Sequence, residues 1–227
     1  MELSHALRTT GSVRRFLDEP VEDGVVYSVL DDARFAPSGG NRQAWRVIVV
    51  KDATLRHEVA EAYLDAWHDY VAHVLAGVVP FSPLASDEDR LAAASQRSAA
   101  ESLSVPDGFP ETLGTVPVML VVTGDLTALA ATDRDLDRYH LVGGASIYPF
   151  VWSILLAAHE RGLGGVMTTV GTRNEPRLQE ILELPTTTMV AAIVALGYPE
   201  SRHTKLTRHA VEEFTTIDTF GGDPLLS

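Results

Sequence analysis

The sequence contains no cysteine among its 227 residues. Disulfide bonds, a thiolate nucleophile and a Cys-ligated metal site are therefore excluded. No stretch reaches the roughly 18 consecutive apolar residues that a membrane-spanning helix needs, and the N-terminus lacks the apolar segment of a signal peptide. We therefore expect a cytoplasmic protein with no membrane partner.

Positive charge is also scarce. The chain has 18 Lys and Arg against 31 Asp and Glu, a formal net charge of −13, and its only lysines are Lys51 and Lys205. Because an acidic chain repels nucleic acids and anionic membranes, we expect neither as a partner. An anionic ligand would need a local basic pocket. Two small clusters could supply one: Arg8, Arg14 and Arg15, and Arg202, Lys205 and Arg208.

No repeat and no flexible linker divides the chain, so we expect a single domain over residues 1–227. Apolar periodicity predicts one helix that begins after Pro20 and ends near Pro37, and others over 55–75, 140–161 and 174–184. Continuous apolar runs predict buried strands at 45–50, 116–123 and 189–196. These elements do not alternate strictly, which favours an α+β fold. No G-x-G-x-x-G turn follows the first strand, so a Rossmann dinucleotide site is unsupported.

The periodicity is interrupted between residues 77 and 111, where four prolines flank an Ala-rich stretch. Ser86 begins that stretch and Asp89 follows three residues later, which is typical of a helix start. We expect a helical excursion here, with a lid over about residues 65–113 that faces the substrate.

Other residue patterns do not support a metal or hydrolase site. Asp133, Asp135 and Asp137 have the spacing that begins a calcium loop, but Arg138 stands where glycine is needed and Gly144 where the bidentate acid should be. The histidines lack the i, i+4 spacing of a metal pair, and Ser38 has no evident Ser/His/Asp constellation. We expect no metal.

Four segments carry a common resemblance. They are RTTGSVRRF at 8–16, APSGGNRQAWR at 36–46, GLGGVMTT at 162–169, and LGYP at 196–199 followed by KLTRHAVEEF at 205–214. Together they resemble the nitroreductase family of FMN flavoproteins over residues 7–222. The resemblance implies a three-layer α/β/α sandwich with a mostly antiparallel central sheet, which forms a homodimer.

The first segment is similar to the family motif R-x-S-x-R, which holds the flavin's phosphate, ribityl chain and pyrimidine edge. Ser12 and Arg14 match this motif. Thr10 stands in place of the leading arginine, and Arg8 is the candidate to replace it. A guanidinium suits this role because it donates several aligned hydrogen bonds and stays charged.

The second segment is similar to the family signature A-P-S-x-x-N-x-Q-P-W, with Ala44 in place of the proline. In the family this loop crosses the dimer interface to a flavin held mainly by the other subunit. Glycines allow the backbone to approach a ring closely, and hydroxyl and amide groups can bond its polar atoms. The resemblance assigns five residues of this loop to cofactor binding: Pro37, Ser38, Gly39, Asn41 and Gln43.

The third segment resembles the family's G-L-G stretch, whose backbone N–H groups lie beside the reactive N5 of the flavin. It implies such a role for the backbone near Gly164 and Gly165, with Met167 and Thr168 also at the cofactor. No side chain is identified as catalytic, because a flavin carries the chemistry itself.

The fourth segment resembles the family's G-Y-P turn followed by a basic pair. By this match Arg208, helped by Lys205, binds the FMN phosphate, and residues 200–227 wrap the partner subunit. The resemblance implies an oxidoreductase that uses NADH or NADPH to reduce a small acceptor such as a nitroaromatic, a quinone or an activated enone.

Two alternatives remain open at this point. Reductive dehalogenation and flavin breakdown use the same cofactor. The dehalogenating branch clamps its substrate with a Glu-x-x-x-Tyr helix and a lysine in the lid. Here Ala62 stands four residues after Glu58 and Asp65 four residues after Glu61, and no lysine occurs between residues 52 and 204, which disfavours that branch. A non-catalytic protein that binds FMN or another metabolite would share all four segments.

Overall fold

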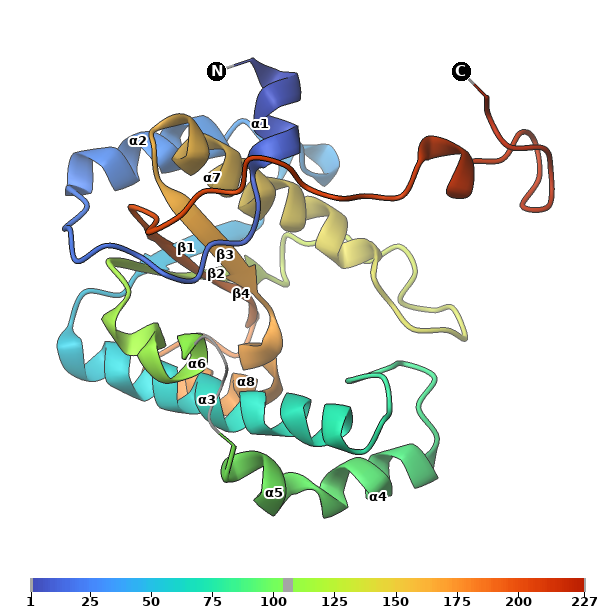
Figure 1. Cartoon of the computed structure of the whole chain (residues 1–227), viewed down its shortest axis with the longest axis horizontal. Coiled ribbons are helices and arrows are strands. Elements are labelled where there is room, and N and C mark those ends of the chain that lie inside the picture. Colours follow the sequence, from blue (N-terminus) through green and yellow to red (C-terminus); the bar gives the residue numbers. More distant parts are fainter. Residues whose placement is uncertain (1, 104–107, 227) are drawn as a thin grey trace.

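A computed structural model describes residues 2–103 and 108–226. It consists of a four-stranded sheet between two layers of helices (Figure 1). The elements, in chain order, are α1 (Leu3–Thr9), α2 (Asp23–Ala33), β1 (Trp45–Val49), α3 (Ala53–Leu75), α4 (Asp87–Ser95), α5 (Arg97–Glu101), α6 (Phe109–Thr112), β2 (Val118–Asp125), α7 (Tyr148–Glu160), β3 (Gly164–Thr168), α8 (Glu175–Ile181) and β4 (Thr188–Gly197).

The strands follow the order β1-β2-β4-β3, and all three neighbouring pairs are antiparallel. This arrangement confirms the predicted α+β class with a mostly antiparallel sheet. The central strands β2 and β4 are buried over most of their length, which explains why both read as unbroken apolar runs in the sequence. Their register shifts once, between Val122 and Thr123.

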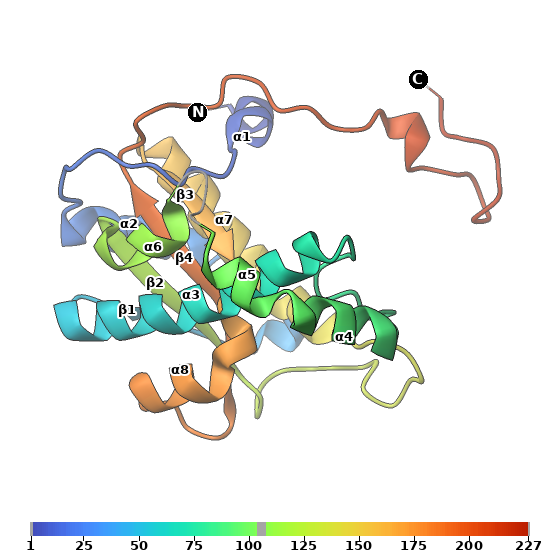
Figure 2. The ribbon, with the colours of Figure 1, turned by 60° about the horizontal axis from the view of Figure 1, so that its bottom comes forward.

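Helices α2 and α7 cover one face of the sheet, and α3, α6 and α8 cover the other (Figures 1 and 2). Each face has its own apolar core. The first includes Val29 and Ile154 against Leu120 and Val194. The second includes Val59 from α3, which packs with strand side chains on the other face of the sheet. The strands supply side chains to both cores because successive side chains of a strand alternate between the two faces. The three-layer sandwich is therefore confirmed.

Two sequence predictions need correction. The helix expected over 140–161 begins only at Tyr148, while residues Val142–Ser146 form a 3-10 turn. The Gly143-Gly144 pair is a poor start for a helix, and Pro149 lies in the first turn of α7, where its missing N–H costs nothing. The prediction of strands only at 45–50, 116–123 and 189–196 was incomplete, because Gly164–Thr168 forms the further strand β3, which pairs with β4.

The excursion between α3 and β2 is helical, as predicted, and its start at Ser86 is confirmed by reciprocal Ser86 and Asp89 capping bonds. Helices α4 and α5 pack along α3 rather than on the sheet (Figure 2). Arg97 anchors them through ion pairs with Asp65 and Asp69 of α3. Residues 104–107 of the predicted excursion and lid lie outside the described part of the chain.

The N-terminal segment runs beside β3 and the stretch that follows β4. Ser12 forms a parallel bridge with Gly165, and Phe16 forms an antiparallel bridge with Pro199. Beyond residue 204 the chain runs away from the body as an extended, exposed tail (Figures 1 and 2). None of the helices in the described ranges is both long and apolar enough to cross a membrane.

Candidate functional site

A cavity of about 500 Å³ lies on the α3 face of the sheet, beside β3. We call it the β3 cavity. Its lining comes from the N-terminal segment, α3, α6 and the stretch that includes the end of β3: Arg14, Tyr63, Trp67, Tyr70, Phe109, Pro110, Val166, Met167, Thr168, Thr169 and Val170. The cavity thus combines aromatic rings, small polar groups and one guanidinium.

Backbone hydrogen bonds fix the N-terminal segment at the edge of this cavity. The N–H of Val13 donates to the carbonyl of Gly165 at 2.9 Å, and the N–H of Leu17 donates to the carbonyl of Tyr198 at 2.8 Å. Arg14 lies between these two anchors and forms no hydrogen bond or ion pair with any residue of the described ranges. Its charge is therefore available to an anionic or carbonyl-bearing ligand.

The third segment divides into a buried part and a part that reaches the cavity. Gly164 and Gly165 are buried in β3, where a Cβ on Gly164 would meet Val13 at 2.8 Å and one on Gly165 would meet Leu196 at 2.5 Å. These glycines allow the N-terminal segment and β4 to pack closely. Met167 and Thr168 line the cavity. The role predicted for the backbone at Gly164 and Gly165 stays a prediction.

The predicted loop Pro37 to Gln43 does not line the β3 cavity. It follows α2, in the helical layer on the other face of the sheet. Its shape is fixed locally: the N–H of Gln43 donates to Ser38 Oγ at 3.0 Å, and the N–H of Gly39 donates to Ser146 Oγ at 3.0 Å. Asn41 has a left-handed φ of 52°, which asparagine tolerates better than most residues.

The remaining predicted residues are exposed and lie outside the cavity lining. Arg8 donates to Ser4 within α1 at 3.4 Å, and Arg208 donates to the neighbouring carbonyl of Thr207 at 2.7 Å. Lys205 lies in the exposed tail. The stretch just before the tail contacts the N-terminal segment, because His203 Nε2 donates to the carbonyl of Ser12 at 3.1 Å. The structure thus brings the segment around Ser12 against residue 203, whereas Lys205 and Arg208 lie beyond this contact in the tail.

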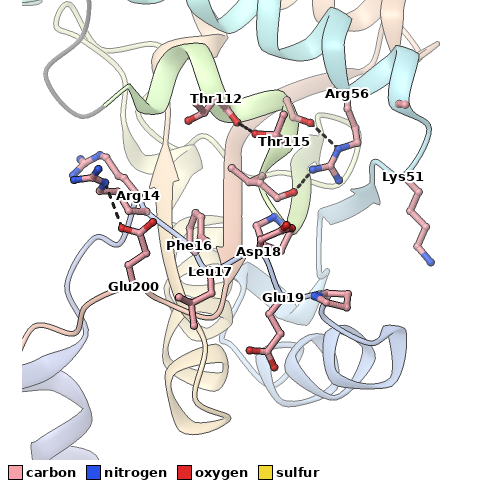
Figure 3. A pocket seen from close by; sticks show the side chains of 16 residues that line it. Arg14, Phe16, Leu17, Asp18, Glu19, Lys51, Arg56, Thr112, Thr115 and Glu200 are labelled. Atoms are coloured by element: carbon pink, nitrogen blue, oxygen red, sulfur yellow. Dashed lines mark hydrogen bonds and ion pairs between the residues drawn. The ribbon is translucent and has the colours of Figure 1, made fainter.

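A larger cavity of about 830 Å³ lies on the other side of Arg14 (Figure 3). Most of its cations are already engaged. Arg15 pairs with Glu200 at 3.5 Å, Lys51 pairs with Asp23, and Arg56 donates to three backbone carbonyls. Asp18 and Glu19 also line it. We therefore regard the β3 cavity, despite its smaller volume, as the candidate site for an anionic cofactor.

Two ionisable groups elsewhere in the chain have pKa values that are shifted from their ordinary ranges. Burial lowers the pKa of His159, whose Nε2 lies 2.9 Å from Thr9 Oγ1 and thereby links α7 to α1. The N–H of Leu141 donates to Asp133, and this bond, with those from Val142 and Arg138, lowers the pKa of the buried Asp133 carboxyl to about 2. Neither residue lines the β3 cavity.

Sequence reasoning missed the aromatic wall of the cavity. Tyr63, Trp67 and Tyr70 were assigned only to a long helix, and Thr169 and Val170 were not singled out. A signal was present, because the spacing of four and then three residues places the three aromatic side chains on one face of α3. The fold of the excursion, which brings Phe109 against Tyr63, had no comparable signal.

Comparison with known proteins gives a consistent result. A sequence model described as the nitroreductase family matches residues 7–198. The NADH dehydrogenase of Thermus thermophilus is 28% identical over 83% of this chain and 82% of its own length, and the nitrobenzene nitroreductase of Ectopseudomonas oleovorans is 27% identical over 93% and 94%. A crystal structure of iodotyrosine deiodinase bound to FMN and 3-iodo-L-tyrosine has a TM-score of 0.67 at 20% identity, covering 96% of this chain and 100% of that one. This last likeness shows the shared fold.

Proposed function

The chain belongs to the nitroreductase family, and from this premise we propose that it is an FMN-dependent oxidoreductase that carries electrons from NADH or NADPH to a small acceptor. The observation that carries the proposal is the guanidinium of Arg14, which has no partner among the described residues. It lies at the edge of an aromatic cavity, on the N-terminal segment that residue 203 contacts. A nitrobenzene nitroreductase and an NADH dehydrogenase among the relatives support it.

The residues present fit FMN. An isoalloxazine ring is planar and apolar on its faces and polar at its edge, and the cavity offers the apolar Val166 and Met167 together with Thr168 and Arg14. The phosphate is a dianion, and Ser12, Lys205 and Arg208 are the groups we assign to it. In a chain of net charge −13, these cations near the end of the sequence are among the few groups that could neutralise such a dianion.

Bound FMN would accept the two electrons of a hydride and pass them on, chemistry that no side chain of this protein offers. The overall reaction balances without a further reagent. NAD(P)H loses a hydride and becomes NAD(P)⁺, and a quinone takes up that hydride and one proton from water to become a hydroquinone. The protein's part is to orient both substrates, exclude water and hold Arg14 where negative charge develops.

We further propose that the working form is a homodimer with two equivalent sites. The loop Pro37 to Gln43 lies in the layer opposite the β3 cavity of its own chain, so a second subunit is the means by which it could reach a flavin. The tail after residue 204 carries apolar side chains with no cover among the described residues, including Phe214 and Phe220, and a partner subunit would bury them.

The purified protein tests this function directly. We expect the visible absorption spectrum of a bound flavin, release of FMN on heating, and oxidation of NADH or NADPH when menadione or a nitroaromatic is added. Bound FMN without turnover of any acceptor would identify a non-catalytic flavin-binding protein. Turnover of 3-iodo-L-tyrosine in preference to menadione would identify a dehalogenase. A colourless protein that gains no flavin on incubation with FMN would refute the proposal.

A further inference from the structure

The wall of the β3 cavity formed by α3 is a continuous set of aromatic rings. Trp67 stacks on Tyr70 with 4.9 Å between ring centroids and 19° between planes, and on Tyr63 with 6.3 Å and 25°. Phe109 meets Tyr63 edge-on at 6.3 Å. The rings of Trp67 and Tyr70 are thus held in nearly parallel planes, which is the preorganisation that a stacking surface needs.

The rings differ in burial. Tyr63 is 1% exposed and Phe109 is 2% exposed, so both serve the core behind the wall. Trp67 and Tyr70 are only half-buried, although both line the cavity. Half-buried aromatic rings leave apolar surface in contact with water, and a planar ligand would remove that surface from water. Trp67 and Tyr70 are therefore the part of the wall that a ligand can reach.

The charge of the cavity lining also restricts which ligands can bind. Arg14 is its sole charged residue, and no Asp, Glu, Lys or His contributes to it within the described ranges. If Arg14 serves the flavin, the described residues of the lining offer no counter-ion to a second ligand. A carboxylate or an ammonium group brought into this cavity would lose its hydration without a partner, which is strongly unfavourable. A zwitterionic amino acid would incur this loss twice.

We propose that Trp67 and Tyr70 are specificity-determining residues, which select an uncharged planar acceptor over charged or zwitterionic aromatic compounds by stacking. The inference rests on the proposed function, since it assigns the acceptor to the cavity that holds the flavin. It goes beyond that function by naming the charge class of the acceptor and the two side chains that recognise it.

The first experiment needs no variant. The holoenzyme is assayed with 4-nitrobenzamide, the nearly isosteric anion 4-nitrobenzoate, and 3-iodo-L-tyrosine, each with saturating NADH or NADPH. We expect kcat/KM for the neutral amide to exceed that for the anion by at least about 10-fold, since the buried carboxylate has no partner. Equal or better turnover of 4-nitrobenzoate or 3-iodo-L-tyrosine would overturn the inference.

The second experiment tests the two side chains. Tyr70→Leu and Trp67→Leu should raise the KM for menadione roughly 10-fold, with kcat changed less than about twofold. Trp67→Phe keeps an aromatic ring and should therefore raise this KM much less than Trp67→Leu does. Tyr27→Leu is the matched control, because Tyr27 is an exposed tyrosine on α2 outside the cavity. Menadione binding to the oxidised holoenzyme should weaken by a similar factor in the Tyr70 variant. Quenching of tryptophan fluorescence measures this binding.

The outcomes separate the two proposals. Leucine variants that keep the menadione KM while they fold and retain FMN would show that the rings do not select the acceptor. Leucine variants that lose FMN would show that the rings form the flavin's own wall, which overturns this inference and leaves the proposed function intact. Wild-type protein without flavin or NAD(P)H oxidation would instead refute the proposed function.

Discussion

The two faces of the sheet hold aromatic side chains in different states. On the α2/α7 face, Phe150 is 2% exposed and stacks on Trp45 with 4.7 Å between centroids and 3° between planes. On the α3 face, Trp67 and Tyr70 stack in a similar way but stay half-buried beside a cavity. The stacking geometry is thus not what distinguishes the aromatic pairs on the two faces. Trp45 is also only half-buried, so the feature that sets Trp67 and Tyr70 apart is the cavity that they line.

The largest expected effect is the loss of activity when site residues on either face are substituted, and its partial recovery in a mixed dimer. A variant with Ser38→Ala and Asn41→Ala, and another with Arg14→Ala and Arg208→Ala, should each lose nearly all activity. Unfolding and refolding an equal mixture should recover about a quarter of wild-type activity, because half of randomly paired dimers are mixed and each mixed dimer has one intact site. Activity is measured as NADH or NADPH oxidation, whichever donor the wild type uses, with menadione as acceptor.

The control for this experiment is each variant refolded alone. No recovery in the mixture, with mixed dimers demonstrated by mass spectrometry, would show that a single chain supplies both groups of residues. A fully active, flavin-bound monomer would contradict the shared site as well. Either result would break the comparison, since the loop after α2 would then serve the site of its own chain rather than that of a partner.

Removal of one ring from each face gives the next largest effect. Phe150→Ala should lower the free energy of unfolding by about 3–5 kcal/mol, because it leaves a cavity among buried neighbours. Tyr70→Ala should lower it by less than about 2 kcal/mol, since part of its surface is already in water. Urea denaturation of the flavin-free proteins measures both values. Equal losses would show that Tyr70 is a core residue and would contradict the distinction drawn here.

The substitution Arg208→Ala extends the comparison to the exposed tail, which belongs to neither helical layer. We expect FMN binding to weaken by about 1.5–3 kcal/mol, the contribution of a charge-assisted hydrogen bond, with little change in the stability of the flavin-free protein. Titration with FMN measures the affinity. Retained affinity together with reduced stability would mean that Arg208 is structural and that the phosphate lies elsewhere.

The smallest effect concerns the loop before α7, which supports the Pro37 to Gln43 loop through Ser146. The pKa of Asp133 is about 2 in the folded protein, below its ordinary value of 3.8. The carboxylate therefore stabilises the fold above about pH 4, and this contribution is lost as pH falls towards about 2. Asp133→Asn should lower the melting temperature at neutral pH, and the gap to wild type should close over that acid range. A gap independent of pH would contradict this account.

The apolar patterns allowed prediction of most of the elements, because β2, β4 and the buried faces of α2 and α3 are strongly apolar, whereas the three layers were implied by the family resemblance alone. Strand β3 escaped prediction, since it has five residues of which Gly164 and Gly165 lack side chains that could show a pattern. Its existence depends on pairing with β4, a contact that no local signal encodes.

The candidate site was predictable in part. Arg14, Met167 and Thr168, which the family resemblance assigns to the cofactor, line one cavity, and their binding of a cofactor stays a prediction. The aromatic wall was not foreseen, because a Tyr or Trp on an amphipathic helix reads first as core. Whether such a ring is covered depends on Phe109 and its neighbours, whose position is set by the path of the excursion rather than by any motif.

The bridges of Ser12 and Phe16 beside β3 have a consequence for solubility. An uncovered strand edge offers a row of unpaired N–H and carbonyl groups on which another chain can add. The N-terminal segment occupies part of that edge at β3, whereas the outer edge of β1 has no strand beside it among the described residues. Truncation before residue 17 would therefore expose a second open edge and favour edge-to-edge aggregation, even though the buried core would be largely unchanged.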